Sequence, residues 1–270
     1  MGAALLAEYR KIVTTRLWWI LLLVMAVYMG FISAVMAWAV SQGDVTTNAG
    51  GQSEPVVLAA DAVVRSVYTI TVSFGYVFPV IVGALAMSSE FRHKTVTPTF
   101  LAEPRRSVVL GAKLAAAGAV GLLFGVVGTL ASAGVGAAVL GILGKPTYLD
   151  VASTWRTLGL SVVALAVWSL VGVGFGTLVT NQVAVIVALL AFTQFVEPVA
   201  RFVLVLTSWG KSVAKFLPGA AGEGISGGSF YSEAGLASLL PSWAALLVLL
   251  GYAVAFAVIG RLVTLRRDIT

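Results

Sequence analysis

The sequence has no cysteine and only one histidine, His93. The absence of cysteine excludes disulfide bonds, catalysis by a thiol and metal sites built from thiolates, and it leaves the cellular compartment undetermined. No His-Glu-x-x-His pattern occurs, and no aspartate falls within a long apolar segment. An intramembrane enzyme needs several His, Asp or Ser side chains that converge at membrane depth, so the sequence argues against that class.

Charge is also scarce in this sequence. Only 10% of the residues are charged and 59% are hydrophobic, with a mean hydropathy of +1.01. A soluble domain has about 25% charged residues, so we expect an integral membrane protein that contacts the lipid bilayer. The net charge is +6, but the basic residues recur at the ends of apolar segments. That distribution is typical of membrane topology signals and predicts no nucleic-acid partner.

The apolar runs predict an all-α membrane protein with a single transmembrane domain over residues 1–270. A helix needs about 20 apolar residues to cross about 30 Å of hydrocarbon. We therefore expect six spans, at residues 17–40, 66–88, 114–143, 157–179, 183–206 and 241–263. The fourth and fifth spans come from one uncharged run that Thr180-Asn181-Gln182 interrupts. Pro79 is expected to kink the second span, which membrane helices tolerate.

Residues 2–16 precede the first expected span and have the pattern of a short amphipathic helix. Tyr9 belongs to an apolar stripe at helical spacing, and Glu8 and Lys11 lie off that stripe. We expect this helix to lie along the cytoplasmic membrane interface with its basic residues against anionic lipid, and its candidate interfacial residues are Glu8, Lys11 and Arg16. The alternative is a charged flank that only sets the topology.

Residues 89–113 form the densest charged stretch, between the second and third expected spans. They include Glu90, Arg92, Arg105 and Arg106. Six spans place both termini on one side, and that side together with residues 89–113 carries more lysines and arginines than the other. The positive-inside bias therefore predicts a multi-pass protein of the cell membrane, with both termini and this segment in the cytoplasm.

The sequence contains no convincing nucleotide site. Gly144-Lys145-Pro146-Thr147 resembles part of a phosphate-binding loop, but Val139 stands where the first glycine is needed. Pro146 also replaces the Ser or Thr that would contact magnesium. We therefore expect no catalytic residue, metal site or cofactor in this chain, and we expect any ATP hydrolysis in a separate polypeptide.

The charged segment carries a recognisable pattern. Glu90-Phe91-Arg92-His93-Lys94-Thr95, followed by Leu101, Pro104-Arg105-Arg106 and Ala112-Lys113, resembles the signature of the ABC-2 type transporter permeases. Ala7-Glu8-Tyr9-Arg10-Lys11 and Thr15-Arg16-Leu17-Trp18-Trp19 also resemble actinobacterial members of that family. The resemblance covers the first 113 residues closely. Lys94 departs from the family, which usually has glycine there.

This resemblance implies one half of an ATP-driven transporter. Two six-span permease subunits, identical or homologous, would sit above two ATPase subunits that bind ATP and magnesium. The segment after the second span would form a coupling helix that docks onto the ATPase, and its candidate docking residues are Glu90, Arg92, Thr95, Pro104, Arg105 and Arg106. The resemblance also implies an interfacial helix before the first span and two short re-entrant helices in residues 207–240. From the residues alone, 207–240 is either a surface loop or such a helix pair.

Glu197 and Arg201 are the charged residues near the outer end of the fifth expected span. Their i, i+4 spacing places them on one helix face, where they can pair. Either one alone would cost several kcal/mol in hydrocarbon. One interpretation is that they line or gate an export pathway, and the other is that they form a structural pair where the span ends.

Together these features predict the permease subunit of an ATP-binding cassette exporter. The alternative is a membrane anchor or sensor subunit that recruits a soluble partner without transport. The sequence does not name a cargo, although the scarcity of charge in the spans favours a hydrophobic or amphipathic one.

Overall fold

The structure is a computed structural model, and it describes residues 2–42, 45–46, 55–56, 60–233 and 237–263. Within these ranges, six helical segments are long and apolar enough to cross a membrane, as the sequence predicts, and the chain is a multi-pass membrane protein. These segments are Leu17–Ser41, Ala60–Arg92, Arg106–Ile142, Ala152–Leu178, Gln182–Val205 and Ser242–Val263. Their length follows from the membrane, where a helix satisfies its own backbone hydrogen bonds.

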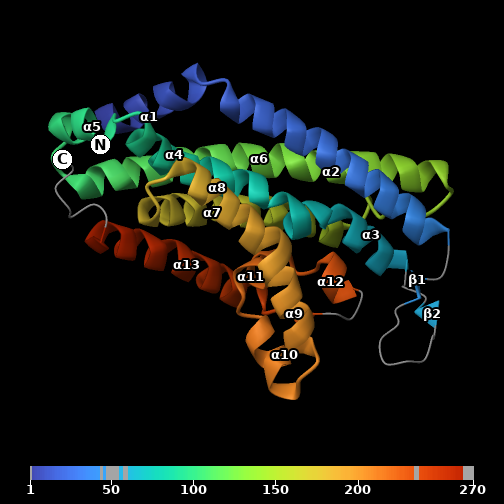
Figure 1. The fold of residues 1–270 in the computed structure, drawn as a ribbon. Helices are drawn as coiled ribbons and strands as arrows, with labels where there is room; N and C mark the ends of the chain where they lie inside the picture. The colour runs from blue at the N-terminus through green and yellow to red at the C-terminus, as the bar shows by residue number, and fades with distance from the viewer. Residues whose placement is uncertain (1, 43–44, 47–54, 57–59, 234–236, 264–270) are drawn as a thin grey trace.

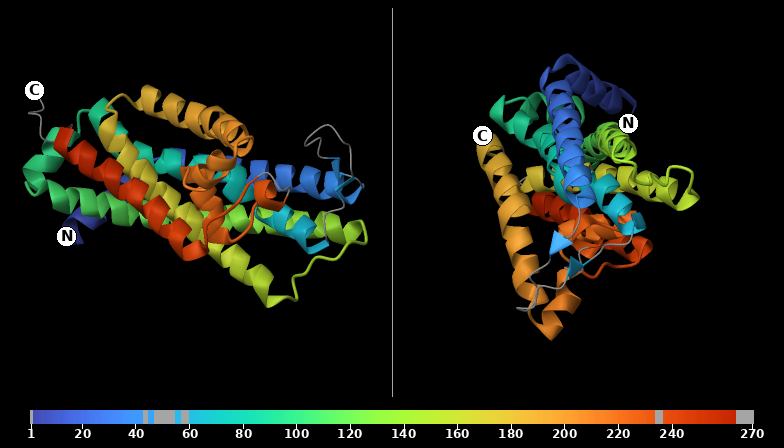
Figure 2. Two further views of the ribbon diagram at one scale, coloured as in Figure 1. Left: turned by 90° about the horizontal axis from the view of Figure 1, so that it is seen from below. Right: turned by 90° about the vertical axis from the view of Figure 1, so that its right-hand side faces the viewer.

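Helix α7 (Ala152–Leu178) lies at the centre of the bundle. It packs against α4 (Val77–Arg92), α6 (Arg106–Ile142) and α13 (Ser242–Val263). Helix α2 (Leu17–Ser41) packs against the other side of α6 (Figure 1). The fifth span, made of α8 (Gln182–Ala191), the π-helical segment η2 (Phe192–Val196) and α9 (Glu197–Val205), lies along the outside of the bundle (Figure 2).

Small residues allow the central helices to approach closely. A Cβ atom added to Gly172 or Gly176 of α7 would collide with the backbone of Val80 or Ala84 in α4. Gly121 of α6 meets α7 in the same way. Close backbone approach through small residues is how membrane helices gain packing energy without a hydrophobic driving force between them. These glycines therefore pack helices of the same chain.

The second span is longer than expected and is irregular at a different place. It begins with α3 (Ala60–Tyr68), continues through the π-helical segment η1 (Thr71–Gly75) and ends with α4 at Arg92. The irregularity is the widened turn of η1, which ends just before Pro79, and Pro79 falls in the first turn of α4. Proline is tolerated there because a first-turn N–H has no partner within the helix.

Residues 89–113 form short turns between helices instead of one loop. Helix α4 continues to Arg92, α5 covers Val96–Ala102, and α6 already begins at Arg106. Lys94 in the turn before α5 has a positive φ of 55°. Helices α1 (Gly2–Thr14) and α5 and the last turn of α13 lie at the same end of the bundle, which we call the α5 end (Figure 1).

Three short helices follow the fifth span: α10 (Ser208–Ala214), α11 (Pro218–Ser226) and α12 (Phe230–Glu233). Every residue of α11 is buried, so this helix enters the bundle. Pro218 starts α11 and Gly227, with a φ of 79°, ends it, which is the common order of helix start and stop residues. At the opposite end from α5, residues Val45–Thr46 (β1) and Pro55–Val56 (β2) form a small antiparallel pair.

Candidate functional site

Four charged side chains from three helices meet at the α5 end. Glu8 and Lys11 belong to α1, Glu90 lies near the end of α4, and Lys113 lies near the start of α6; we call them the basal cluster. Lys113 Nζ lies 3.0 Å from Glu8 Oε2 and 2.8 Å from Glu90 Oε1. Lys11 Nζ lies 2.7 Å from Glu8 Oε1 and also contacts Glu90 Oε1. Two carboxylates and two ammonium groups balance each other.

The basal cluster is largely removed from solvent. The side chain of Lys113 is 0% exposed, and its Nζ also donates to the carbonyl oxygen of Ala86 at 2.8 Å. Glu8 and Glu90 are buried as well. Charges in such a place are tolerable only when each has a partner, since an uncompensated buried charge costs several kcal/mol. The cluster therefore fixes α1 to the ends of two spans, α4 and α6, at the α5 end of the bundle.

Lys11 is the one member of the basal cluster that is partly open to solvent. Burial opposes its charged form, but hydrogen bonds to Glu8 and Glu90 outweigh that effect and raise the pKa of Lys11 above its ordinary value. Lys11 therefore remains protonated throughout the physiological range.

The expectation for the polar side of α1 is wrong for Glu8. The helical pattern places Glu8 off the apolar stripe of α1, yet Glu8 is buried against the bundle. The reason is that Lys113 supplies a counter-charge inside the bundle, which a single-helix pattern does not reveal. Arg16 lies in the turn before α2, is exposed and does not belong to the cluster.

The predicted docking residues separate into two groups in the structure. Glu90 is buried in the basal cluster, where it pairs with Lys113, so its side chain is not exposed at the surface. Arg92, Thr95, Pro104 and Arg105 are exposed, and Arg106 is partly exposed. They surround α5, which is fixed by the buried side chain of Val96 and presents Leu101 with 78% of its surface exposed. We call this exposed region the α5 surface.

Local contacts hold the arginines of the α5 surface. Arg105 donates to both carboxylate oxygens of Glu103, at 2.9 and 3.2 Å. This hydrogen-bonded arginine lowers the pKa of Glu103 below its ordinary value. The guanidinium of Arg106 lies 5.3 Å from the ring centre of Phe100. Arg92 donates to Gln182 at the start of the fifth span, at 3.3 Å. The α5 surface thus combines positive charge with an exposed leucine.

A second charged cluster lies inside the bundle, around Arg201. Its guanidinium lies 2.9 Å from Glu197 Oε1 through Nη2 and 2.8 Å from Glu223 Oε1 through Nη1. Glu197 Oε1 also accepts hydrogen bonds from the backbone N–H of Gly219 at 2.6 Å and of Ala220 at 3.2 Å. These bonds join α9 to the first turn of α11, and we call Glu197, Arg201 and Glu223 the α11 cluster.

Glu223 completes the α11 cluster and was not expected there. The i, i+4 spacing of Glu197 and Arg201 predicts their pairing, and the structure shows it. Glu223 reaches Arg201 because α11 folds back into the bundle, and the hydroxyl of Ser229 donates to its other oxygen at 2.7 Å. The sequence signal was a glutamate within a Gly- and Ala-rich segment too apolar for an exposed loop. Lys113 was likewise noted in the signature without an assigned role.

The two clusters share one property, since each joins a peripheral helix to the core of the bundle through buried charges. Among the described residues, no group of three or more His, Asp or Glu side chains is placed to hold a metal ion. The arrangement places α5 between two spans and fixes α1 to α4 and α6 at the same end of the bundle. Compared with known proteins, the chain matches no protein-family model and no curated protein sequence.

Proposed function

We propose that this chain is the membrane-spanning permease subunit of an ATP-binding cassette exporter. In this proposal the α5 end lies in the cytoplasm of a cell whose plasma membrane the six spans cross. A separate ATPase subunit docks on the α5 surface, and a second permease subunit, identical or homologous, completes the pathway. ATP and magnesium belong to the ATPase.

The observation that carries the proposal is that α5 lies between the ends of α4 and α6, which the basal cluster joins to each other and to α1. A short helix transmits a push from a soluble partner only if its own base does not yield. Here the turn before α5 follows the buried Glu90, and the turn after it leads into the helix that carries the buried Lys113. A displacement of α5 is therefore passed to two spans and to α1 as one body, which is how rigid-body transitions are transmitted.

Exposed apolar side chains support the need for a second subunit or for lipid around the fifth span. Phe195, Val199 and Phe202 are each more than half exposed along one side of η2 and α9.

The buried, paired state of Glu197 and Arg201 supports the structural interpretation of that pair, because their hydrogen bonds hold α11 in place. In this proposal the pathway lies between subunits, and α11 closes part of its outer side.

The proposal is tested by purifying the chain from its native membranes in mild detergent and identifying co-purifying proteins by mass spectrometry, with an ATPase assay. The variant Arg105→Glu/Arg106→Glu reverses two charges on the α5 surface. Lys211→Glu/Lys215→Glu makes the same change in and next to α10, far along the chain from α5. We expect an ATPase with wild type and with the α10 variant, and its loss with the α5 variant.

Two other outcomes would change the assignment. A wild-type preparation with no ATPase subunit would refute the permease proposal. An ATPase that binds through the α5 surface while vesicles containing the complex move no amphipathic dye would favour the second candidate, an anchor or sensor subunit. That candidate shares the exposed α5 surface but predicts that ATP hydrolysis is not coupled to transport.

A further inference from the structure

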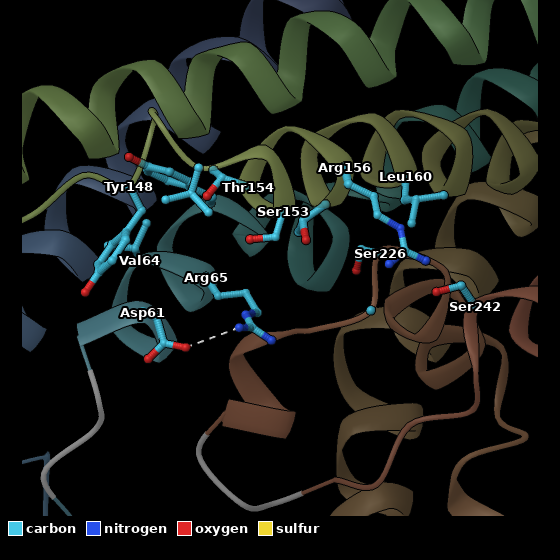
Figure 3. Close-up of a pocket in the computed structure, with 14 residues that line it drawn as sticks. Asp61, Val64, Arg65, Tyr148, Ser153, Thr154, Arg156, Leu160, Ser226 and Ser242 are labelled. Carbon is cyan, nitrogen blue, oxygen red and sulfur yellow. Dashed lines mark hydrogen bonds and ion pairs between the residues drawn. The ribbon is translucent and has the colours of Figure 1, made fainter.

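A cavity of about 420 Å³ opens at the end of the bundle opposite α5. Its walls are α3, the connection between α6 and α7 with Tyr148 and Val151, the first turns of α7, the end of α11 and the first residue of α13 (Figure 3). Its size is within the usual range of small-ligand sites, roughly 300–1,000 Å³. Neither charged cluster described above contributes a side chain to it.

Hydrogen-bond donors dominate the polar lining of this cavity. The arginine side chains of Arg65 and Arg156 both point into it (Figure 3), together with the hydroxyls of Ser153, Thr154 and Ser242. In the described part of the chain, Arg156 and these three hydroxyls donate to no protein acceptor. Arginine presents a planar fork of donors that matches phosphate and carboxylate oxygens. The cavity therefore offers an exposed guanidinium, that of Arg156, and three hydroxyls that can each donate one hydrogen bond.

Two carboxylates lie close enough to offset the positive charge of the cavity, and both are directed at Arg65. Asp61 lines the cavity, and its Oδ2 lies 3.4 Å from Arg65 Nη2. Glu233 Oε1 lies 3.5 Å from Arg65 Nε. Both distances exceed those of a good charge-assisted hydrogen bond, about 2.7–2.9 Å. Arg65 is thus weakly held by acidic neighbours, and Arg156 supplies the positive charge that these neighbours do not reach.

The position of the cavity along the spans is marked by two tryptophans. Trp155 precedes Arg156 in the first turn of α7, and Trp243 follows Ser242 in the first turn of α13. They are 56% and 69% exposed, respectively. Exposed tryptophans at the ends of spans occupy the level of the lipid headgroups. Val64, Val151 and Leu160 add apolar surface beside the donors.

From this combination we infer that the cavity binds a phosphate ester at the lipid–water interface, with Arg156 as its principal charge partner and Arg65 as the second. The uncommitted donors select an anion rich in acceptor oxygens. The headgroup level and the apolar wall fit the phosphate of a phospholipid, and a free phosphate ester offers the same group without the acyl chains. Residues of this chain alone form the site, so binding does not depend on an ATPase partner.

The inference is tested by titrating the purified chain in detergent and following tryptophan fluorescence. Dioctanoyl phosphatidylglycerol is compared with dioctanoylglycerol, which has the same acyl chains but no phosphate. Glycerol 3-phosphate and inorganic phosphate serve as competitors, since they carry the phosphate without acyl chains. We expect saturable binding of the phosphatidylglycerol and much weaker binding of the dioctanoylglycerol.

Two variants locate the site. Arg156→Gln removes a charged donor from an exposed position, and we expect about tenfold weaker binding, or more, with an unchanged melting temperature. Arg156→Lys keeps the positive charge but lacks the planar fork of donors, so its affinity should lie between those of wild type and Arg156→Gln. Lys145→Gln removes one positive charge at the same end of the bundle but outside the cavity, and it should bind as wild type does.

The outcomes separate the sources of the phosphate and can refute the site. Full competition by glycerol 3-phosphate or inorganic phosphate identifies a free phosphate ligand, whereas competition by acylated compounds alone identifies a lipid. Equal binding of dioctanoylglycerol, an equal loss in Lys145→Gln and Arg156→Gln, or no binding of any phosphate compound would each overturn the inference.

Discussion

Replacing Lys113 by methionine tests whether the basal cluster holds α1 and α6 together. Methionine keeps the length and apolar stem of the side chain, so the change removes mainly the charge. In wild type, Lys113 Nζ is within 3.0 Å of Glu8, Glu90 and the carbonyl of Ala86, and its side chain has no exposure to solvent. After the change, Lys11 is the one remaining counter-charge of Glu8 and Glu90 among the residues that the structure describes.

The expected size follows from the burial of the group. Removing one partner of a buried ion pair costs about 3–5 kcal/mol, because the other charge stays behind without compensation. For a chain of this length, that corresponds to a loss of about 6–20 °C in melting temperature. The same change at the exposed Lys145 removes no such pair, so Lys145→Met is the matched control and should stay within about 0.5 kcal/mol of wild type.

A charge-balanced variant sharpens the test. Glu8→Gln/Lys113→Met leaves one carboxylate, Glu90, and one ammonium group, Lys11, so the net charge of the cluster is again zero. We expect the double variant to lose about 1–3 kcal/mol less than the sum of the two single changes.

Melting temperatures followed by tryptophan fluorescence in detergent measure the loss, and hydrogen exchange over residues 2–14 reports whether α1 detaches. Additive losses in the double variant, or a Lys113→Met protein as stable as Lys145→Met, would refute the reasoning.

Three further predictions follow from separate features. Lys94 has a left-handed backbone conformation, which costs a non-glycine residue about 1–2 kcal/mol. Lys94→Gly should therefore raise the free energy of unfolding by about 0.5–1 kcal/mol, after the backbone entropy that glycine loses on folding is subtracted. Lys94→Val should lower it in the same thermal assay. Gly176→Ala places a Cβ against the backbone of Ala84 and should lower the free energy of unfolding by about 1–3 kcal/mol. Gly134→Ala is the control, because its Cβ would meet no atom within 4 Å, and it should be neutral or stabilising. Equal effects of the two variants would contradict the packing described for α4 and α7. Folding raises the pKa of Lys11 above 10.5, so the stabilisation that the charged Lys11 contributes is complete below pH 10.5 and is lost as the pH rises through the pKa of the folded state. Above that pKa, the melting temperature of wild type should therefore fall more steeply with pH than that of Lys11→Met.

Much of the fold could be predicted from the sequence because the membrane imposes one strong rule. Each crossing must be a helix of sufficient apolar length, so hydropathy alone locates the six spans. The break between the fourth and fifth spans is a good example. Asn181 starts α8 as its N-cap, and its side chain accepts from the backbone N–H groups of Val183 and Ala184. A polar residue within an uncharged run thus has a local physical role that the sequence reveals.

The second helical segment begins earlier than the span predicted at residues 66–88, because the end of the polar stretch before that span is itself helical. Residues up to Arg65 were expected outside the span, yet α3 begins at Ala60. Asp61 and Arg65 are one helical turn apart and partner each other, so both charges are compatible with a helix at the membrane surface. Hydropathy adds up residues one at a time and does not register such compensation.

The candidate site was less predictable, since it depends on contacts between distant segments. The pattern around α5 indicated which residues would be exposed, but it could not show that Glu90 points away from that surface. The burial of Glu8 and the recruitment of Glu223 each require a second helix to arrive with a counter-charge. One helix pattern contains no information about that arrival, so only the tertiary structure assigns these residues.

The order of synthesis gives the basal cluster a consequence for membrane insertion. Glu8 leaves the ribosome early, while Lys113 follows it 105 residues later. Lys11 is the one member of the basal cluster that is close to Glu8 in the chain, and Glu90 follows Lys11 by 79 residues. Until the third span has entered the bilayer, Glu8 has no buried counter-charge and α1 must remain in contact with water or headgroups. The final seating of the first helix therefore waits for the third crossing, so truncation before residue 113 should leave the N-terminus open to protease.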